Sequence, residues 1–155
     1  MTVGNASGIN DGASILVIGS YEFGQKYNLK PKARILASAA SGVEPRLMGI
    51  GPVEAIQKAL SRAQMELRNM DIIEINEAFA SQVLSCTKLL KLSDDDSRLN
   101  SNGGAIAIGH SLGASGARLA LTATANLEQQ KVKYAVVSLC VGLGQGLAMV
   151  LERFQ

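Results

Sequence analysis

Histidine, cysteine and aromatic residues are scarce in this chain, and each scarcity excludes a class of function. The 155 residues include a single histidine, His110, so any mechanism that needs two histidines within the chain is excluded. The two cysteines, Cys86 and Cys140, are too few for a disulfide-stabilised scaffold. Aromatic residues make up 4% and tryptophan is absent, which argues against a surface that stacks nucleic-acid bases.

Charged residues are also few, at 18%, and the net charge is only +2. Without long runs of lysine or arginine, the chain does not have the composition of a dedicated nucleic-acid binder. With 47% hydrophobic residues over 155 positions, it is predicted to form one folded domain or part of one. No cluster of side chains with metal-ligand spacing is visible, so no metal is expected.

The longest uncharged run covers residues 134–151, close to the length of a short transmembrane helix. Three glycines and a glutamine interrupt its middle, so we predict two buried strands joined by a glycine-rich turn, without a membrane span. No secretory signal opens the chain. A cytoplasmic location is therefore expected, and a mitochondrial or peroxisomal one stays open.

Apolar patterns predict an alternation of strands and helices. The predicted strands are residues 13–20, 33–43, 72–75, 134–139 and 147–151, and the predicted helices are residues 21–29, 53–65, 77–92 and 111–130. This alternation favours an α/β layered fold in which helices cover a mixed five-stranded sheet. Residues 105–108 are predicted to be a buried apolar stretch. The Ala- and Gly-rich helix at 111–130 is suited to burial between two layers.

Residues 109–113 (GHSLG) fit the G-x-S-x-G pattern of the serine-hydrolase nucleophile elbow. That mechanism needs a base histidine downstream of the serine, whereas the only histidine, His110, directly precedes Ser111. Adjacent residues cannot adopt the required geometry, which argues against a serine hydrolase.

Residues 142–146 (GLGQG) allow more than one interpretation. Phosphate binding requires a helix after the glycines, and a strand-like segment follows instead. The segment is then either a tight turn between strands or a loop whose backbone N–H groups line an oxyanion pocket. Cys140 precedes it; a buried cysteine is most often inert, but at a strand end beside free N–H groups it is a candidate for acid–base chemistry. Cys86, within a predicted helix, is interpreted as a packing residue.

Asn76 and Glu77 stand at a predicted junction between a strand and a helix. Asparagine is a good N-cap and glutamate suits a first helical turn, so a structural role is sufficient to explain both. An asparagine at this position is also able to hold a water molecule or polarise a carbonyl group.

Four segments, in this order, resemble the C-terminal half of the thiolase family, of the acetyl-CoA acetyltransferase and 3-ketoacyl-CoA thiolase type. They are residues 4–13 (GNASGINDGA), 76–80 (NEAFA), 102–118 (NGGAIAIGHSLGASGAR) and 140–146 (CVGLGQG). The resemblance runs through essentially all 155 residues. It implies a thiolase-like layered fold with residues 1–155 as the C-terminal domain, and it implies that the N-terminal nucleophile domain and the CoA-binding loop region are absent from the chain.

The resemblance also implies a role for individual residues. His110 would be the base that activates the nucleophilic cysteine of the other half, and Cys140 would move the proton at the carbon that becomes a nucleophile. Asn76 would hold the water of one oxyanion hole, and the backbone N–H of Gly142 would help to form the second. Three further residues would lie along the pantetheine arm of coenzyme A: Ser7, Ala78 and Phe79.

Two positions depart from the usual family pattern. Ser111 stands where the family usually has proline, and because serine is a good N-cap a following helix can still begin there. Leu143 stands where the family usually has glycine. If the backbone φ angle at this position is positive, the leucine costs roughly 1 kcal/mol or more.

The function that follows is that of a thiolase acyltransferase, which moves acetyl or acyl groups between CoA thioesters by Claisen condensation or by thiolysis of 3-ketoacyl-CoA. The chain would be one part of a split enzyme of fatty acid metabolism, active only in a hetero-oligomer with an N-terminal half that supplies the nucleophilic cysteine. Coenzyme A and acyl-CoA would enter as substrates, with no tightly bound cofactor. The missing half should leave an exposed apolar face and hence a large interface. The alternatives are a non-catalytic thiolase-derived interaction module, a truncated fragment, or a binder of CoA esters without chemistry.

Overall fold

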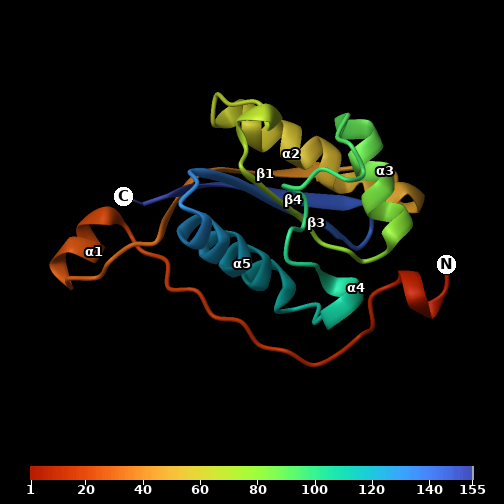
Figure 1. The fold of residues 1–155 in the computed structure, drawn as a ribbon, viewed down its shortest axis with the longest axis horizontal. Coiled ribbons are helices and arrows are strands. Elements are labelled where there is room, and N and C mark those ends of the chain that lie inside the picture. Colours follow the sequence, from red (N-terminus) through yellow and green to blue (C-terminus); the bar gives the residue numbers. More distant parts are fainter. Residues whose placement is uncertain (155) are drawn as a thin grey trace.

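A four-stranded mixed sheet forms the centre of the computed structural model, which describes residues 1–154. The strands are β1 (Ala33–Gly42), β2 (Ile72–Ile75), β3 (Tyr134–Val141) and β4 (Gln145–Arg153), arranged in the order β1-β4-β3-β2. β4 pairs antiparallel with both β1 and β3, whereas β2 pairs parallel with β3. Helices cover both faces of the sheet (Figure 1). The predicted α/β class is therefore confirmed, with four strands rather than five.

The strand predicted at residues 13–20 does not form. These residues run outside the sheet toward the short helix α1 (Tyr21–Lys26), past α5 (Ser115–Gln130) (Figure 1). Ile15 and Val17 are each 84% exposed, although the segment is apolar. A strand needs a neighbour to pair its backbone N–H and C=O groups, and no strand within residues 1–154 lies beside this segment. The prediction of a strand at residues 13–20 is therefore wrong: its apolar composition is typical of a strand, but no pairing partner lies beside it among residues 1–154.

One face of the sheet packs against α2 (Gly51–Arg62), with α3 (Ala80–Leu90) beside it. α2 begins with Pro52 in its first turn, where a missing N–H costs nothing, and it buries an apolar stripe at Ala55, Ile56, Ala59 and Leu60. These side chains join buried residues of the sheet: Ala39, Ile73, Ile75, Val136, Ala148 and Val150. The helices predicted at 53–65 and 77–92 are thus present with slightly shifted ends.

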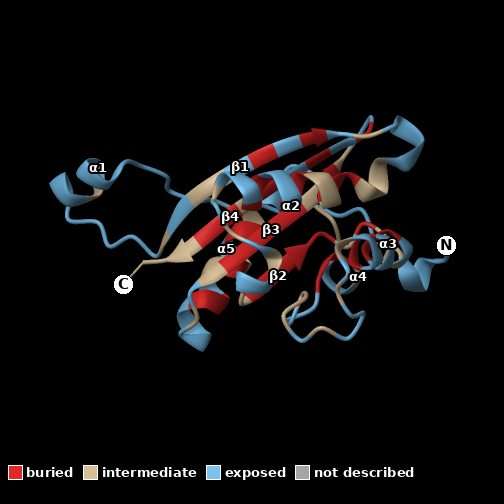
Figure 2. Cartoon of the chain, turned by 90° about the horizontal axis from the view of Figure 1, so that it is seen from above, coloured by how far each residue is buried: buried red, intermediate tan, exposed pale blue. Residues whose placement is uncertain are grey.

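The opposite face of the sheet packs against α5, through Leu119, Ala123 and Leu127. α5 begins at Ser115 rather than at Ser111, because residues 111–114 form a turn. Before it comes the four-residue helix α4 (Ala105–Ile108). The buried stretch predicted there is wrong in part: Ala105 is buried, but Ile108 is 62% exposed. Figure 2 shows the buried residues concentrated on the central strands, while α1 and the chain around it are exposed.

The long uncharged run at residues 134–151 forms the paired strands β3 and β4. Their register pairs Val141 with Gln145, so the chain reverses over three residues, as the prediction of a tight turn required. No helix within residues 1–154 combines the length and the hydropathy that a membrane crossing demands.

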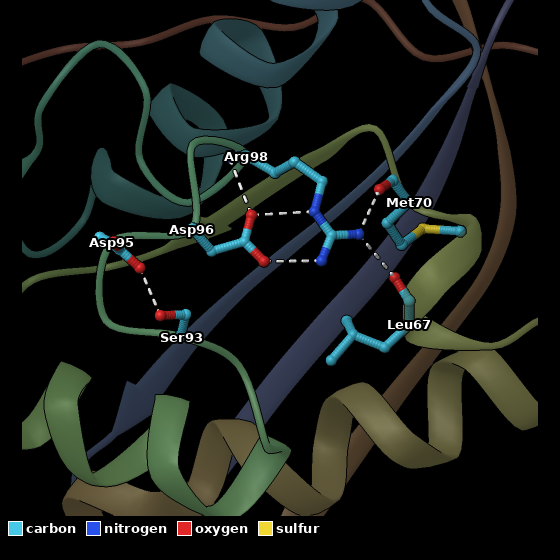
Figure 3. A network of polar contacts seen from close by, with 6 residues as sticks. All are labelled: Leu67, Met70, Ser93, Asp95, Asp96 and Arg98. Carbon is cyan, nitrogen blue, oxygen red and sulfur yellow. Dashed lines mark hydrogen bonds and ion pairs between the residues drawn. The ribbon is translucent and has the colours of Figure 1, made fainter.

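The segment after α3 is fastened by a cluster of polar contacts around Arg98 (Figure 3). The Arg98 guanidinium donates from Nε and Nη2 to the two carboxylate oxygens of Asp96, at 2.9 and 2.7 Å. It also donates to the backbone oxygens of Met70 at 2.9 Å and Leu67 at 3.4 Å. The next residues run alongside β2. There the side-chain oxygen of Asn100 accepts a hydrogen bond from the Ile75 N–H, and its side-chain nitrogen donates to the Ile75 oxygen. The Arg98 cluster thereby fixes the chain next to the end of β2.

Candidate functional site

His110 lies in the short connection between α4 and α5. The preceding Gly109 has a φ of +89°, and a Cβ atom there would lie 2.4 Å from the side-chain oxygen of Asn10. Only glycine accommodates both this conformation and this close approach. The backbone N–H of His110 donates to the Gly8 oxygen at 2.8 Å, so the N-terminal segment holds the histidine from the other side.

The Nδ1 atom of His110 lies 2.6 Å from the hydroxyl oxygen of Ser115. That hydroxyl donates its own hydrogen to the backbone oxygen of Ser111 at 3.0 Å. Because the single hydroxyl hydrogen is committed to Ser111, the serine oxygen accepts a hydrogen bond from Nδ1. His110 therefore carries its proton on Nδ1.

The Nε2 atom of His110 lies 3.3 Å from the side-chain nitrogen of Asn76, which is 1% exposed. The orientation of this amide is set from its other end, since Arg118 Nη2 donates to Asn76 Oδ1 at 3.1 Å. With the oxygen facing Arg118, the amide N–H faces the imidazole and donates to Nε2. Both contacts indicate the same tautomer of His110, with the hydrogen on Nδ1 and the lone pair on Nε2.

Two effects lower the pKa of His110 below its ordinary value. Burial of the ring is the larger, and the positive charge of Arg118 is the second. The imidazole is consequently neutral at pH 7. A neutral imidazole whose unprotonated Nε2 accepts only the weakly held amide hydrogen of Asn76, at 3.3 Å, is equipped to accept a proton from a nearby thiol or carbon acid.

Cys140 lies near the end of β3 and is 8% exposed. Burial raises the pKa of its thiol, so the group is protonated at neutral pH and is a weaker acid than an exposed thiol. The backbone N–H of Asn76 donates to the Ser138 oxygen at 2.9 Å, two residues before Cys140. The parallel strands β2 and β3 thus bring Asn76 and Cys140 to one edge of the sheet. No hydrogen bond joins Cys140 to His110 in the described part of the chain.

Gly142 begins the turn between β3 and β4 and is exposed. Leu143 has a φ of +64° and Gly144 a φ of +84°, a left-handed conformation that glycine adopts freely and leucine only at a conformational cost. A Cβ atom at Gly144 would lie 2.2 Å from the Val43 oxygen. The segment is therefore a tight turn between strands rather than a dinucleotide loop, and the oxyanion role of Gly142 stays a prediction.

The structure also brings together the three residues assigned to the pantetheine arm. Ser7 donates from its backbone N–H and from its hydroxyl to the Ala78 oxygen, at 3.0 and 3.1 Å. The neighbouring Ala6 forms an antiparallel bridge with Phe79. The N-terminal segment thus runs between the end of β2 and His110, while contact of these residues with coenzyme A stays a prediction.

Two weaker interpretations are resolved by the contacts. The hydroxyl of Ser111 donates to the side-chain oxygen of Asn10 at 3.3 Å, while His110 contacts Ser115, so the hydrolase pattern has no serine–histidine pair of the required kind. Cys86 is completely buried among the residues that pack against α2, and burial raises its pKa to about 11. It is a core residue, as predicted.

Three residues around the site were not predicted from the sequence: Ser115, Arg118 and Glu74. Ser115 and Arg118 are three residues apart in the first turn of α5, which places them on one side of the helix and over the end of β2. This three-residue spacing is present in the sequence after His110. Because the helix was predicted to begin at Ser111, the spacing did not place the two residues in its first turn. Glu74 carried a signal as well, since it is a carboxylate in the middle of a four-residue apolar strand.

Comparisons with known proteins agree on one relationship. Residues 29–153 match the family described as thiolase, C-terminal domain. The chain is 57% identical over 153 residues to a beta-ketoadipyl-CoA thiolase from Acinetobacter baylyi, covering 99% of this chain and 38% of that protein. The fold is similar to the crystal structure of the Bacillus anthracis acetyl-CoA acetyltransferase, with a TM-score of 0.95, 41% identity, and coverage of 99% of this chain and 38% of the other.

A further solved structure of the same kind was determined with a ligand. It is the human mitochondrial 3-ketoacyl-CoA thiolase in complex with CoA, with a TM-score of 0.90 and 41% identity, and the match covers 99% of this chain and 39% of that chain. The chain therefore spans well under half the length of the proteins that it matches.

Proposed function

This chain belongs to the thiolase family, and from that premise we propose that it supplies the C-terminal part of an active site that transfers acyl groups between CoA thioesters. The observation that carries the proposal is the geometry of His110: its Nδ1 lies 2.6 Å from the Ser115 hydroxyl and its Nε2 lies 3.3 Å from the Asn76 side-chain nitrogen. An imidazole that is held in this way with an unprotonated Nε2 is the group that a thiol nucleophile needs as its base.

Each predicted site residue has a part in this reaction. His110 accepts the proton of a nucleophilic cysteine and afterwards donates to the thioester oxygen. Cys140 moves the proton at the carbon next to the thioester, and its resting thiol, whose pKa burial raises, holds the proton that this carbon receives in thiolysis. Asn76 holds the water of one oxyanion hole and the backbone N–H of Gly142 helps to form the second, and preorganised donors of this kind contribute on the order of 3 kcal/mol each.

The nucleophilic cysteine is proposed to come from an N-terminal part of a thiolase outside these residues. Cys86 is a buried core thiol and Cys140 is assigned another role, which leaves no third cysteine among the 155 residues. The exposed apolar segment around Ile15, Val17 and Ile18 supports such a partner, because soluble surfaces rarely leave neighbouring large apolar side chains exposed. We propose that this surface is covered in the complete assembly.

The substrates are proposed to be acyl-CoA thioesters and free coenzyme A, which react and leave rather than stay bound. The matched relative acts on beta-ketoadipyl-CoA by its name, and the human relative was solved with CoA. A 3-ketoacyl-CoA is therefore the first substrate to test. Hetero-oligomer formation and a cytoplasmic location stay predictions.

Reconstitution tests the proposal. The chain is co-expressed with the part of the Acinetobacter baylyi thiolase that it does not cover, and thiolysis of 3-ketoacyl-CoA is measured in the purified assembly. We expect activity that falls at least 1,000-fold in His110→Ala, in line with the loss of a general base, and strongly in Cys140→Ala. Ser111→Ala is the matched control, one residue away, and should change the rate less than twofold.

The opposite result has a clear meaning. If the purified assembly is inactive and His110→Ala and Cys140→Ala change nothing, the catalytic proposal is wrong and the chain is an interaction module or an inactive fragment. If the chain alone binds acetyl-CoA without turnover, it is a binder of CoA esters.

A further inference from the structure

Glu74 is a buried carboxylate that neither the fold nor the proposed reaction uses. It lies in β2, is 1% exposed, and neither of its carboxylate oxygens accepts a hydrogen bond from the described residues. Side chains alternate across a strand, and Ile72 belongs to the cluster packed under α5. Glu74 therefore faces α5 too, as does Asn76, which contacts Arg118 from that helix.

The charged groups around Glu74 are few. Arg118 reaches the end of β2 from α5, where it bonds Asn76, two residues after Glu74. Its positive charge lowers the pKa of the Glu74 carboxyl, whereas the charge of Glu77, in the segment that follows β2, raises it. The Glu77 oxygens are already engaged by the Asn100 amide at 2.9 Å and the Ile106 N–H at 3.2 Å. Arg98, in the segment beside β2, directs its guanidinium to Asp96 and to two backbone oxygens. The stretch of β3 paired with β2, residues 135–138, carries no charged side chain.

The same Arg118 reaches the histidine. It donates to Asn76, whose amide donates to Nε2 of His110, and its charge also acts on the imidazole directly. Arg118 is consequently shared: it is bonded to Asn76, which contacts His110, and its charge acts on Glu74 on the same face of β2.

We propose that Glu74 is a positioning residue of this site, whose ionisation offsets the charge of Arg118 and thereby tunes the basicity of His110. The inference rests on the proposed function for its significance, but the electrostatic link itself does not require turnover. When Glu74 is neutral, Arg118 bears an uncompensated positive charge that disfavours protonation of the imidazole. When Glu74 is ionised, that charge is partly neutralised and His110 becomes a stronger base.

Burial raises the pKa of Glu74 to about 7, so the change of charge falls in the neutral pH range. Desolvation is the main cause, Arg118 opposes it, and Glu77 adds to it. A carboxyl group that is buried here without a hydrogen-bond partner lowers the stability of the fold, which an apolar side chain at this position would not do.

A titration followed by NMR tests the link without any activity. His110 is the only histidine of the 155-residue chain, so its imidazole resonances are assigned without ambiguity. In the unmodified chain we expect a main transition at a pH below the ordinary histidine pKa, and a second, smaller inflection near pH 7 as Glu74 ionises. In Glu74→Gln the second inflection should vanish while the main transition remains.

The matched control is Glu54→Gln, which removes an exposed carboxylate of α2 that pairs with Lys58. It should retain both inflections. A Glu74→Gln titration that superimposes on that of the unmodified chain overturns the proposal.

If Glu74→Gln does not fold, the proposal is tested on the unmodified chain alone. The carboxyl carbon of Glu74, observed with 13C-labelled glutamate, should then titrate near pH 7 at the same midpoint as the second His110 inflection. A Glu74 midpoint near 4.5, or a His110 curve with one transition only, overturns the proposal. Inactivity of the reconstituted assembly would count against the proposed function and leave this link intact.

Discussion

Arg98 and Arg118 each bridge segments that are distant in the sequence, but their guanidinium groups are bonded very differently. Arg98 forms a two-point ion pair with Asp96 and two further bonds to backbone oxygens (Figure 3). Arg118 donates a single bond, to Asn76. Glu74, a buried carboxylate on which the charge of Arg118 acts, accepts no hydrogen bond from the described residues.

The pKa values of the carboxyl groups of Asp96 and Glu74 reflect this difference in bonding. Hydrogen bonds from Arg98 lower the pKa of Asp96, whereas burial raises the pKa of Glu74 to about 7. A satisfied pair of this kind fastens a loop and is chemically inert in the neutral range. A buried carboxylate without hydrogen-bond partners lowers the stability of the fold, and such groups are typical of functional sites. The contrast separates the part of the chain that holds the fold from the part that is arranged around His110.

The largest expected effect is on the stability of Glu74→Gln as a function of pH. Between its ordinary pKa of 4.5 and about 7, folded Glu74 holds a proton that the unfolded chain has released. Stability is therefore lost as pH rises through this window, by on the order of 3 kcal/mol. Glutamine does not ionise, so the free energy of unfolding of the variant should gain that amount relative to the unmodified chain between pH 5 and pH 8. Denaturant unfolding of both proteins at pH 5 and pH 8 measures this gain. A stability difference between them that is the same at both pH values would show that Glu74 does not change its charge in this range.

A smaller effect is expected at the other arginine. Arg98→Met removes both bonds to Asp96 and should lower the free energy of unfolding by about 2 kcal/mol at pH 7. Because the pKa of Asp96 is lowered in the folded state, the contribution of the pair is present above the ordinary carboxylate pKa and is lost as pH falls below it. Unfolding measured at pH 7 and at pH 3 should thus show the difference shrinking in acid. A cost for Arg118→Met as large as that for Arg98→Met would contradict the contrast.

The smallest effect concerns the strained turn. Leu143 is 85% exposed and has a φ of +64°, so its side chain contributes no burial to offset the conformational cost. Leu143→Asn should raise the free energy of unfolding by up to about 1 kcal/mol, because asparagine tolerates this conformation. Leu112→Asn, at an exposed residue without a positive φ, is the matched control and should give no gain. Equal effects of the two substitutions in thermal unfolding would show that the turn is not strained.

Much of the fold was predictable because local pattern and tertiary packing agree. β2 forms at residues 72–75 as predicted, and the apolar stripes of α2 and α5 meet the two faces of the sheet. The error at residues 13–20 has a physical origin. Composition reports that a segment is able to be a strand, but pairing depends on a neighbour that the composition of the segment does not reveal.

The site was predictable only in part for a related reason. His110 and Asn76 carried recognisable motifs, and the structure places their side chains 3.3 Å apart. Ser115 and Arg118 lie within the segment at residues 102–118 but have no chemical signature of their own, and the signal of Glu74 is only that of a carboxylate in an apolar strand. Their importance comes from distances between α5 and β2, which separate segments of the chain contribute. The chemical roles assigned to the site residues stay predictions.

The most direct test of the account is the thiolysis rate of the reconstituted assembly, compared between Arg118→Met and Arg98→Met at equal amounts of folded protein. Loss of Arg118 frees the Asn76 amide to rotate away from His110, and small errors in the placement of a base cost about 100-fold in rate. The account predicts a fall of that order for Arg118→Met and less than threefold for Arg98→Met. Equal rates in the two variants would contradict the claim that Arg118 orients the Asn76 amide toward the base.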